Sequence, residues 1–70
     1  MSDPSVTARR GTGLTPAELR VLEVRDDVDT DADAALLLGC SVHTVRAHLR
    51  NARSRLGVHS TQRAIRKALA

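Results

Sequence analysis

The chain has 70 residues, of which 41% are hydrophobic and none is aromatic, and its net charge is +3. This length allows one domain with a small core of leucine, valine, isoleucine and alanine, and the lack of aromatic rings argues against proteins that stack single-stranded bases. A single cysteine excludes an internal disulfide and no apolar run approaches the ~20 residues of a membrane span, so we expect a cytoplasmic protein without membrane contact.

Residues 1–13 are polar and contain one proline and two glycines, which predicts a flexible tail or linker. The first helix is expected after Thr15, because the sequence TPAE that starts there combines a capping box with a proline at the first helical position. This helix is expected to end near Asp26, and Val28 occupies the place where a terminating glycine is common.

The second helix is expected to begin after Thr30 and to end at Gly39, because glycine tolerates the left-handed conformation found at helix ends. Asp31 and Asp33 lie in its first turn, where the positive end of the helix dipole favours carboxylates. A tight turn at Gly39, followed at once by another helix, predicts a helix-turn-helix.

The third helix is expected over residues 42–56, with Ser41 as its cap. Its apolar residues recur at spacings of four, three and four and form one stripe: Val45, Leu49, Ala52 and Leu56. A different face carries His43, Arg46, Ala47, Arg50 and Ser54. This division indicates a helix that packs on one side and presents arginines on another.

A short fourth helix is expected over residues 61–69, with Ser60 as its cap, and should bury Ala64, Ile65 and either Ala68 or Leu69. The connections are short and no strand is predicted. The fold class is therefore an all-α, four-helix domain over residues 14–70 that contains a helix-turn-helix.

The charges divide along the chain. All eight acidic residues lie in residues 1–33, which contain four arginines and carry −4, whereas residues 34–70 contain only basic charged residues and carry +7. An arginine-rich helical half is typical of a protein that binds a polyanion. The aspartates within residues 26–33 form an acidic edge that should oppose phosphate, so neutralising Asp31 and Asp33 together should tighten binding to any duplex.

The order and spacing of these residues resemble the LuxR/GerE-type DNA-binding domain of bacterial transcription regulators, without a gap from Leu14 to about Leu69. The matching residues are Leu14-Thr15-Pro16, Glu18, Val21-Leu22, Thr30, Asp33, Ala35, Leu38-Gly39, Ser41, Thr44-Val45-Arg46, His48-Leu49, Asn51, Arg53, Leu56-Gly57-Val58 and Ala64-Ile65. The chain departs from the family at three positions. The family usually has glycine where this chain has Val28, often a basic residue where it has Ala32, and usually a large aliphatic residue where it has Ala34.

The resemblance implies sequence-specific binding of double-stranded DNA, with helix 42–56 in the major groove. Arg46 and Arg50 are four residues apart and point the same way, and the arginine fork fits guanine O6 and N7. We expect both to contact bases, together with Ala47, which can touch at most a thymine methyl.

The first turn of helix 42–56 offers hydroxyls and free backbone N–H groups that suit a phosphate oxygen. The residues expected to contact phosphates are Ser41, His43, Thr44 and Arg53. By resemblance, helix 61–69 is the dimer surface, with Ile65 and Leu69 as its candidate residues. We expect a weak homodimer that forms mainly on DNA, and RNA polymerase is a further candidate partner.

No metal, cofactor or catalytic site is predicted. The group Cys40, His43 and His48 suggests zinc, but a closed zinc site needs four ligands and no second cluster of cysteine and histidine exists. Cys40 occupies a turn position that is usually apolar in the family that the chain resembles, and the resemblance therefore implies a small buried hydrophobe there. The chain has neither a glycine-rich phosphate loop nor a nucleophile elbow, and four short helices should leave no room for a pocket of ~300 Å³, so an enzyme is not expected.

Two alternative functions stay open from the sequence. Residues 49–56 (LRNARSRL) also resemble region four of a sigma factor, which would read a promoter element. A helix-turn-helix can also serve as a protein-binding module, and the acidic edge at residues 26–33 favours this second alternative.

Overall fold

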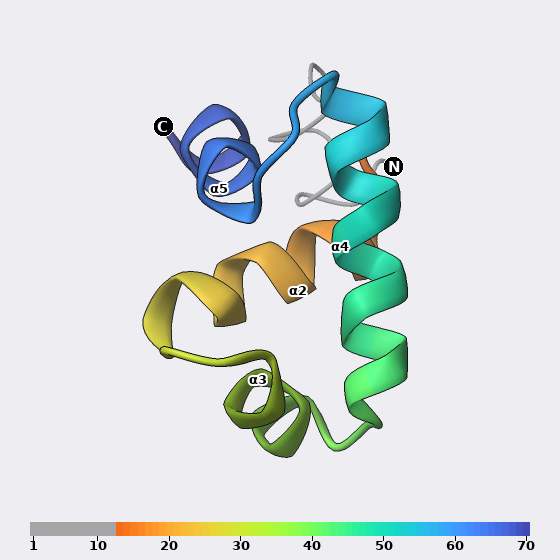
Figure 1. The fold of residues 1–70 in the computed structure, drawn as a ribbon, viewed down its shortest axis with the longest axis vertical. Helices are drawn as coiled ribbons and strands as arrows, with labels where there is room; N and C mark the ends of the chain where they lie inside the picture. The colour runs from red at the N-terminus through yellow and green to blue at the C-terminus, as the bar shows by residue number, and fades with distance from the viewer. Residues whose placement is uncertain (1–12) are drawn as a thin grey trace, which may run out of the picture.

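The computed structural model describes residues 13–70, which form helices α2 (Pro16–Asp27), α3 (Asp31–Leu38), α4 (Val42–Leu56) and α5 (Thr61–Leu69) (Figure 1). The described chain contains no strand, so the all-α fold class is confirmed. The predicted tail lies outside the described residues except for Gly13, which is exposed. No helix in the described part is both long enough and apolar enough to cross a membrane.

Helix α2 begins with the predicted capping box. The Thr15 hydroxyl accepts a hydrogen bond from the Glu18 backbone at 3.1 Å, and the Glu18 carboxylate accepts one from the Thr15 backbone at 3.0 Å. The helix ends without a glycine, and Val28 has extended backbone. Instead, the Arg25 guanidinium donates to the carbonyls of Val28, at 2.7 Å, and Asp29, at 3.1 Å, so a side chain closes this loop.

Helices α3, α4 and α5 also begin and end where the sequence predicts. Their caps, Thr30, Ser41 and Ser60, each accept a hydrogen bond from the backbone N–H three residues later. Gly39 and Gly57 end α3 and α4 with left-handed φ angles of 69° and 70°. These conformations let the following backbone N–H groups bond back to the last turn of each helix.

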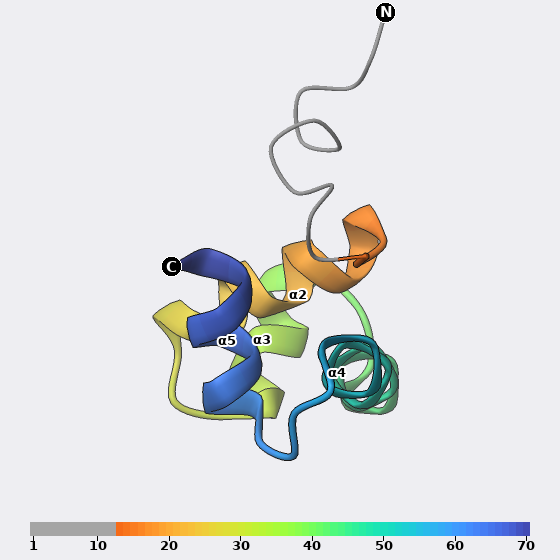
Figure 2. The same ribbon diagram turned by 90° about the horizontal axis from the view of Figure 1, so that it is seen from above.

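Helix α2 lies in the middle of the domain and packs against α3, α4 and α5, while α4 lies along one side (Figures 1 and 2). All four residues of the predicted α4 stripe are buried. The buried hydrophobic core consists of Leu19, Val21, Leu22, Val24, Ala34, Ala35, Val45, Leu49, Ala52, Leu56, Ala64 and Ala68. Helix α5 therefore packs through its alanines, and Ile65, predicted to be buried, is only partly so.

The apolar run in α3 does not all face the core. Only Ala34 and Ala35 are buried, whereas Leu36 and Leu37 are 81% and 67% exposed. Successive residues of an α-helix are turned by about 100°, so the apolar run at residues 34–38 extends all round the helix and cannot face the core along its whole length. The consequence is an exposed pair of leucines on the outer side of the helix-turn-helix.

The prediction that Cys40 is buried is wrong, because Cys40 is exposed. Its backbone N–H bonds to the Ala35 carbonyl at 3.1 Å and completes the cap of α3. The apolar residues of this turn that pack against the core are its neighbours Leu38 and Val42. Cys40 is therefore part of the turn that ends α3 and not of the core.

Candidate nucleic-acid interface

Helix α4 presents the predicted base-contacting residues on its solvent side. Arg46 and Arg50 are exposed, and Ala47 is half-buried. Neither α2, α3 nor α5 covers the outer side of α4 in either view of the fold (Figures 1 and 2). Arg50 makes no hydrogen bond or ion pair with another described residue, so its guanidinium is available to a ligand.

The beginning of α4 carries exposed polar groups. The Ser41 hydroxyl accepts a hydrogen bond from the Thr44 backbone at 3.1 Å, and the two hydroxyls are also 3.1 Å apart. Ser41, His43 and Thr44 are all exposed, and the first turn contains no acidic residue. The two hydroxyls thus belong to the helix cap. One of them donates in the contact between them, so the other keeps an O–H that can donate to a phosphate oxygen.

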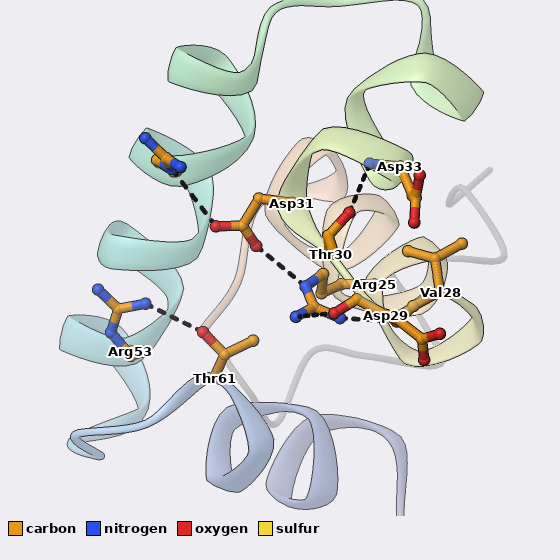
Figure 3. A network of polar contacts seen from close by, with 9 residues as sticks. Arg25, Val28, Asp29, Thr30, Asp31, Asp33, Arg53 and Thr61 are labelled. Carbon is orange, nitrogen blue, oxygen red and sulfur yellow. Dashed lines mark hydrogen bonds and ion pairs between the residues drawn. The ribbon is translucent and has the colours of Figure 1, made fainter.

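Arg46 is linked to the loop between α2 and α3 through Asp31. One carboxylate oxygen of Asp31 accepts from Arg25 Nε at 2.9 Å, and the other lies 3.5 Å from Arg46 Nε (Figure 3 labels Arg25 and Asp31). Arg25 also holds the two carbonyls that close this loop. One residue of the acidic edge, Asp31, therefore lies beside Arg46 of α4.

Sequence reasoning did not find this network. Arg25 lies in the last turn of a helix that has no terminal glycine, and basic side chains can bind the last carbonyls of a helix. This local pattern could have indicated its role. Asp31 and Arg46 are 15 positions apart. Their pairing depends on how α3 packs against α4, and no local pattern predicts it.

Arg53, predicted to contact phosphate, is half-buried at the junction of α4 and α5. Its NH1 group donates to the Thr61 hydroxyl at 3.1 Å (Figure 3). The contact joins the last turns of α4 to the first residue of α5. Arginine has five N–H donors, and this contact uses one of them.

Arg55 points toward α2 and not toward the outer face of α4. Its Nε lies 2.9 Å and 3.1 Å from the two carboxylate oxygens of Glu18, which is buried. Burial alone would raise the pKa of Glu18, but the hydrogen bonds with Thr15 and the Arg55 guanidinium outweigh it and lower the pKa below its ordinary value. Arg55 therefore contributes to the fold.

The predicted dimer residues, Ile65 and Leu69, are partly buried and line an open groove of about 660 Å³ between α2 and α5. The expectation that the helices leave no room for a pocket is wrong. Helix α5 packs through Ala64 and Ala68, which leaves its larger residues along the edge of the core. Charged side chains of both signs, including Asp26 and Arg66, also line the groove.

Within the described residues, no three histidine, cysteine, aspartate or glutamate side chains gather where they could hold a metal ion. Residues 12–68 match the protein family described as bacterial regulatory proteins, luxR family. The match covers all four described helices except the last residue of α5. No similar curated protein and no similar solved structure was found.

Proposed function

Because the chain belongs to the LuxR family of bacterial regulatory proteins, whose helix-turn-helix domains bind double-stranded DNA, we propose that it binds DNA sequence-specifically with α4 in the major groove. The observation that carries this proposal is the uncovered face of α4, on which Arg46 and Arg50 are both exposed. The family match favours this function over region four of a sigma factor.

In the proposed complex, Arg46 and Arg50 donate to base edges, and Ala47 between them is small enough to permit close approach. The phosphate contacts come from Ser41, His43 and Thr44 at the start of α4 and from Arg53 near its end. This distribution would fix the helix on the backbone at both ends and place the two arginines over the bases between them.

The test begins with selection of bound duplexes from a random pool, followed by binding measurements on the selected duplex and a scrambled one. Arg50→Ala should remove ~1–3 kcal/mol of discrimination between them. Arg63→Ala is the matched control, because it also removes one exposed positive charge but lies on α5 and not on α4. It should weaken binding to both duplexes alike. Equal losses with Arg50→Ala would mean that Arg50 contacts only phosphate.

We also propose that two copies pair through the groove between α2 and α5 when bound to adjacent half-sites. Val28, Ile65 and Leu69 supply apolar surface there. Asp26 and Arg66 provide opposite charges that a two-fold axis would bring together across the contact. The apolar area is small, so this dimer should be weak off DNA.

Leu69→Glu should abolish cooperative binding to paired half-sites. Leu69 also packs against the core, so the melting temperature must be measured alongside, and Arg66→Glu provides a second variant at an exposed position. Loss of cooperativity in both folded variants supports the interface. If Leu69→Glu unfolds, Leu69 serves the core. If Arg66→Glu folds and still binds cooperatively, the groove is not the interface.

A second candidate function is a contact with RNA polymerase through the outer side of α3. The exposed Leu36 and Leu37 favour it, because they lie on the helix that begins with Asp31 and Asp33. Such an apolar and acidic surface suits a protein partner better than DNA. Purified polymerase should bind the wild-type chain but should not bind the double variant Leu36→Gln, Leu37→Gln. DNA binding should be the same in the two chains. Equal capture of both chains would exclude this contact.

A further inference from the structure

Asp31 lies between two arginines from different helices, Arg25 of α2 and Arg46 of α4. We propose that Asp31 is a positioning residue for sequence recognition: it orients the Arg46 guanidinium so that its terminal nitrogens face the bases. This inference rests on the proposed function of α4 and adds a determinant of specificity that does not itself touch DNA.

The Asp31 carboxylate is held in place from the side of α2. Arg25 Nε donates to one carboxylate oxygen at 2.9 Å, and the terminal nitrogens of Arg25 are fixed on the Val28 and Asp29 carbonyls. Arg25 and Asp31 are both partly buried, with side chains 22% and 29% exposed. The carboxylate therefore has a defined position relative to α4, unlike an acidic side chain on an open surface.

The second carboxylate oxygen of Asp31 faces Arg46 through the Nε atom, at 3.5 Å. Contact through Nε leaves both terminal nitrogens of the guanidinium free, and these are the atoms that form the fork for guanine O6 and N7. The Arg46 side chain is 63% exposed, so this fork is accessible. An arginine that is already oriented loses less conformational freedom when it binds a base.

Asp33 provides an internal comparison, because it lies in the same first turn of α3 and carries the same charge. Its backbone N–H donates to Thr30, but its carboxylate forms no ion pair with any residue that the structure describes. Each aspartate carries one negative charge that should repel phosphate. Only Asp31 can change how Arg46 reads a base, so Asp33→Asn separates charge from positioning.

The contact can be tested in the free 70-residue chain by NMR of the arginine Nε–H groups. In the wild-type chain and in Asp33→Asn, the chemical shift of the Arg46 Nε–H should differ from that of an unrestrained arginine, and this hydrogen should exchange slowly with water. In Asp31→Asn it should match an unrestrained arginine. An Arg46 signal that is identical in the wild-type chain and in Asp31→Asn would overturn the proposal, whatever the chain does with DNA.

The effect on recognition is measured as the ratio of affinities for a selected and a scrambled duplex, in variants shown by their melting curves to be folded. Asp31→Asn should lower this ratio about tenfold, whereas Asp33→Asn should tighten binding to both duplexes and leave the ratio unchanged. An unchanged ratio in Asp31→Asn would make Asp31 a source of repulsion only and would overturn the positioning role.

A double-mutant cycle shows whether Asp31 acts through Arg46. In an Arg46→Ala chain, Asp31→Asn should leave the ratio unchanged, and a further fall would show a different route and overturn the proposal. If the wild-type chain prefers no sequence, the proposed function fails and the role of Asp31 in recognition fails with it. In that case the NMR experiment still reports whether Asp31 orients Arg46, so the two failures are distinguishable.

Discussion

Among the residues that the structure describes, two carboxylate–arginine pairs join α4 to other helices, one near each end of α4. Near its C-terminal end, Arg55 pairs with Glu18, whose side chain is 4% exposed, at 2.9 Å. Near its N-terminal end, Arg46 pairs with Asp31, whose side chain is 29% exposed, at 3.5 Å. The two pairs have the same chemistry, but they differ in burial, in distance and in the other groups that hold the carboxylate.

This difference separates a contact that stabilises the fold from one that leaves an arginine available. A buried carboxylate must be hydrogen-bonded, and Glu18 is held by Thr15 as well as by Arg55. A loose and partly exposed pair contributes little to stability, and contact through Nε leaves free the terminal nitrogens of Arg46, which we assign to base recognition. Burial of the carboxylate therefore separates the structural arginine of α4 from the one that we assign to recognition.

The largest effect is expected from Glu18→Ala, which removes the capping box and the partner of Arg55 together. The free energy of unfolding should fall by about 2–3 kcal/mol. Urea denaturation measures this loss, with Asp26→Asn as the control on the same helix, because Asp26 is exposed. The control should change stability by less than about 0.5 kcal/mol. Similar losses in the two variants would contradict a structural role for Glu18.

Low pH should weaken the pair of Glu18 with Arg55 and lower the stability of the chain. The pKa of Glu18 is lowered in the folded state, so its contribution to stability is present above the ordinary value of 4.5 and is lost as the pH falls through the lower folded value. The melting temperature of the wild-type chain should therefore fall more steeply below about pH 4.5 than that of Glu18→Gln. Parallel curves for the two chains would show that Glu18 does not gain stability from its ionised form.

A smaller loss is expected from Arg55→Ala. Arg55 is half exposed, and the hydrogen bonds between Thr15 and Glu18 remain, so the free energy of unfolding should fall by about 1 kcal/mol. Arg55→Lys keeps the charge and should recover part of this loss in the same denaturation assay. If Arg55→Ala were as damaging as Glu18→Ala, the ion pair and not the capping box would dominate at this end of α2.

The smallest effect on stability is expected from Asp31→Asn, at most about 0.5 kcal/mol, because its pairs with Arg25 and Arg46 are partly exposed. Asp33→Asn is again the control for the loss of one negative charge at the start of α3. Thermal melts of the two variants should nearly coincide. A loss in Asp31→Asn as large as that in Glu18→Ala would remove the distinction between the two pairs.

The caps and helix boundaries could be predicted because their signals are local. The capping box at Thr15, the caps at Ser41 and Ser60 and the terminal glycines of α3 and α4 depend on residues within a few positions of one another. The buried stripe of α4 also follows from periodicity within one helix. The family match agrees with the resemblance that these residues carry.

The sequence did not predict features that depend on how the helices pack. The exposure of Cys40 follows from which residues of the turn between α3 and α4 reach the core, and the groove beside Ile65 follows from the packing of α5 through its alanines. Neither property is visible in the periodicity of a single helix, because each depends on the position of a neighbouring one.

The sequence by itself therefore determined the four helices, their ends and the concentration of arginine on α4. Only the tertiary structure decided what each arginine does: Arg55 reaches the buried Glu18, Arg46 reaches Asp31, and Arg50 stays without a partner among the described residues. The physical reason is range. Caps and helix periodicity act between residues a few positions apart. The ion pair of Asp31 with Arg46 spans 15 positions and that of Glu18 with Arg55 spans 37, and only helix packing brings such residues within reach of each other.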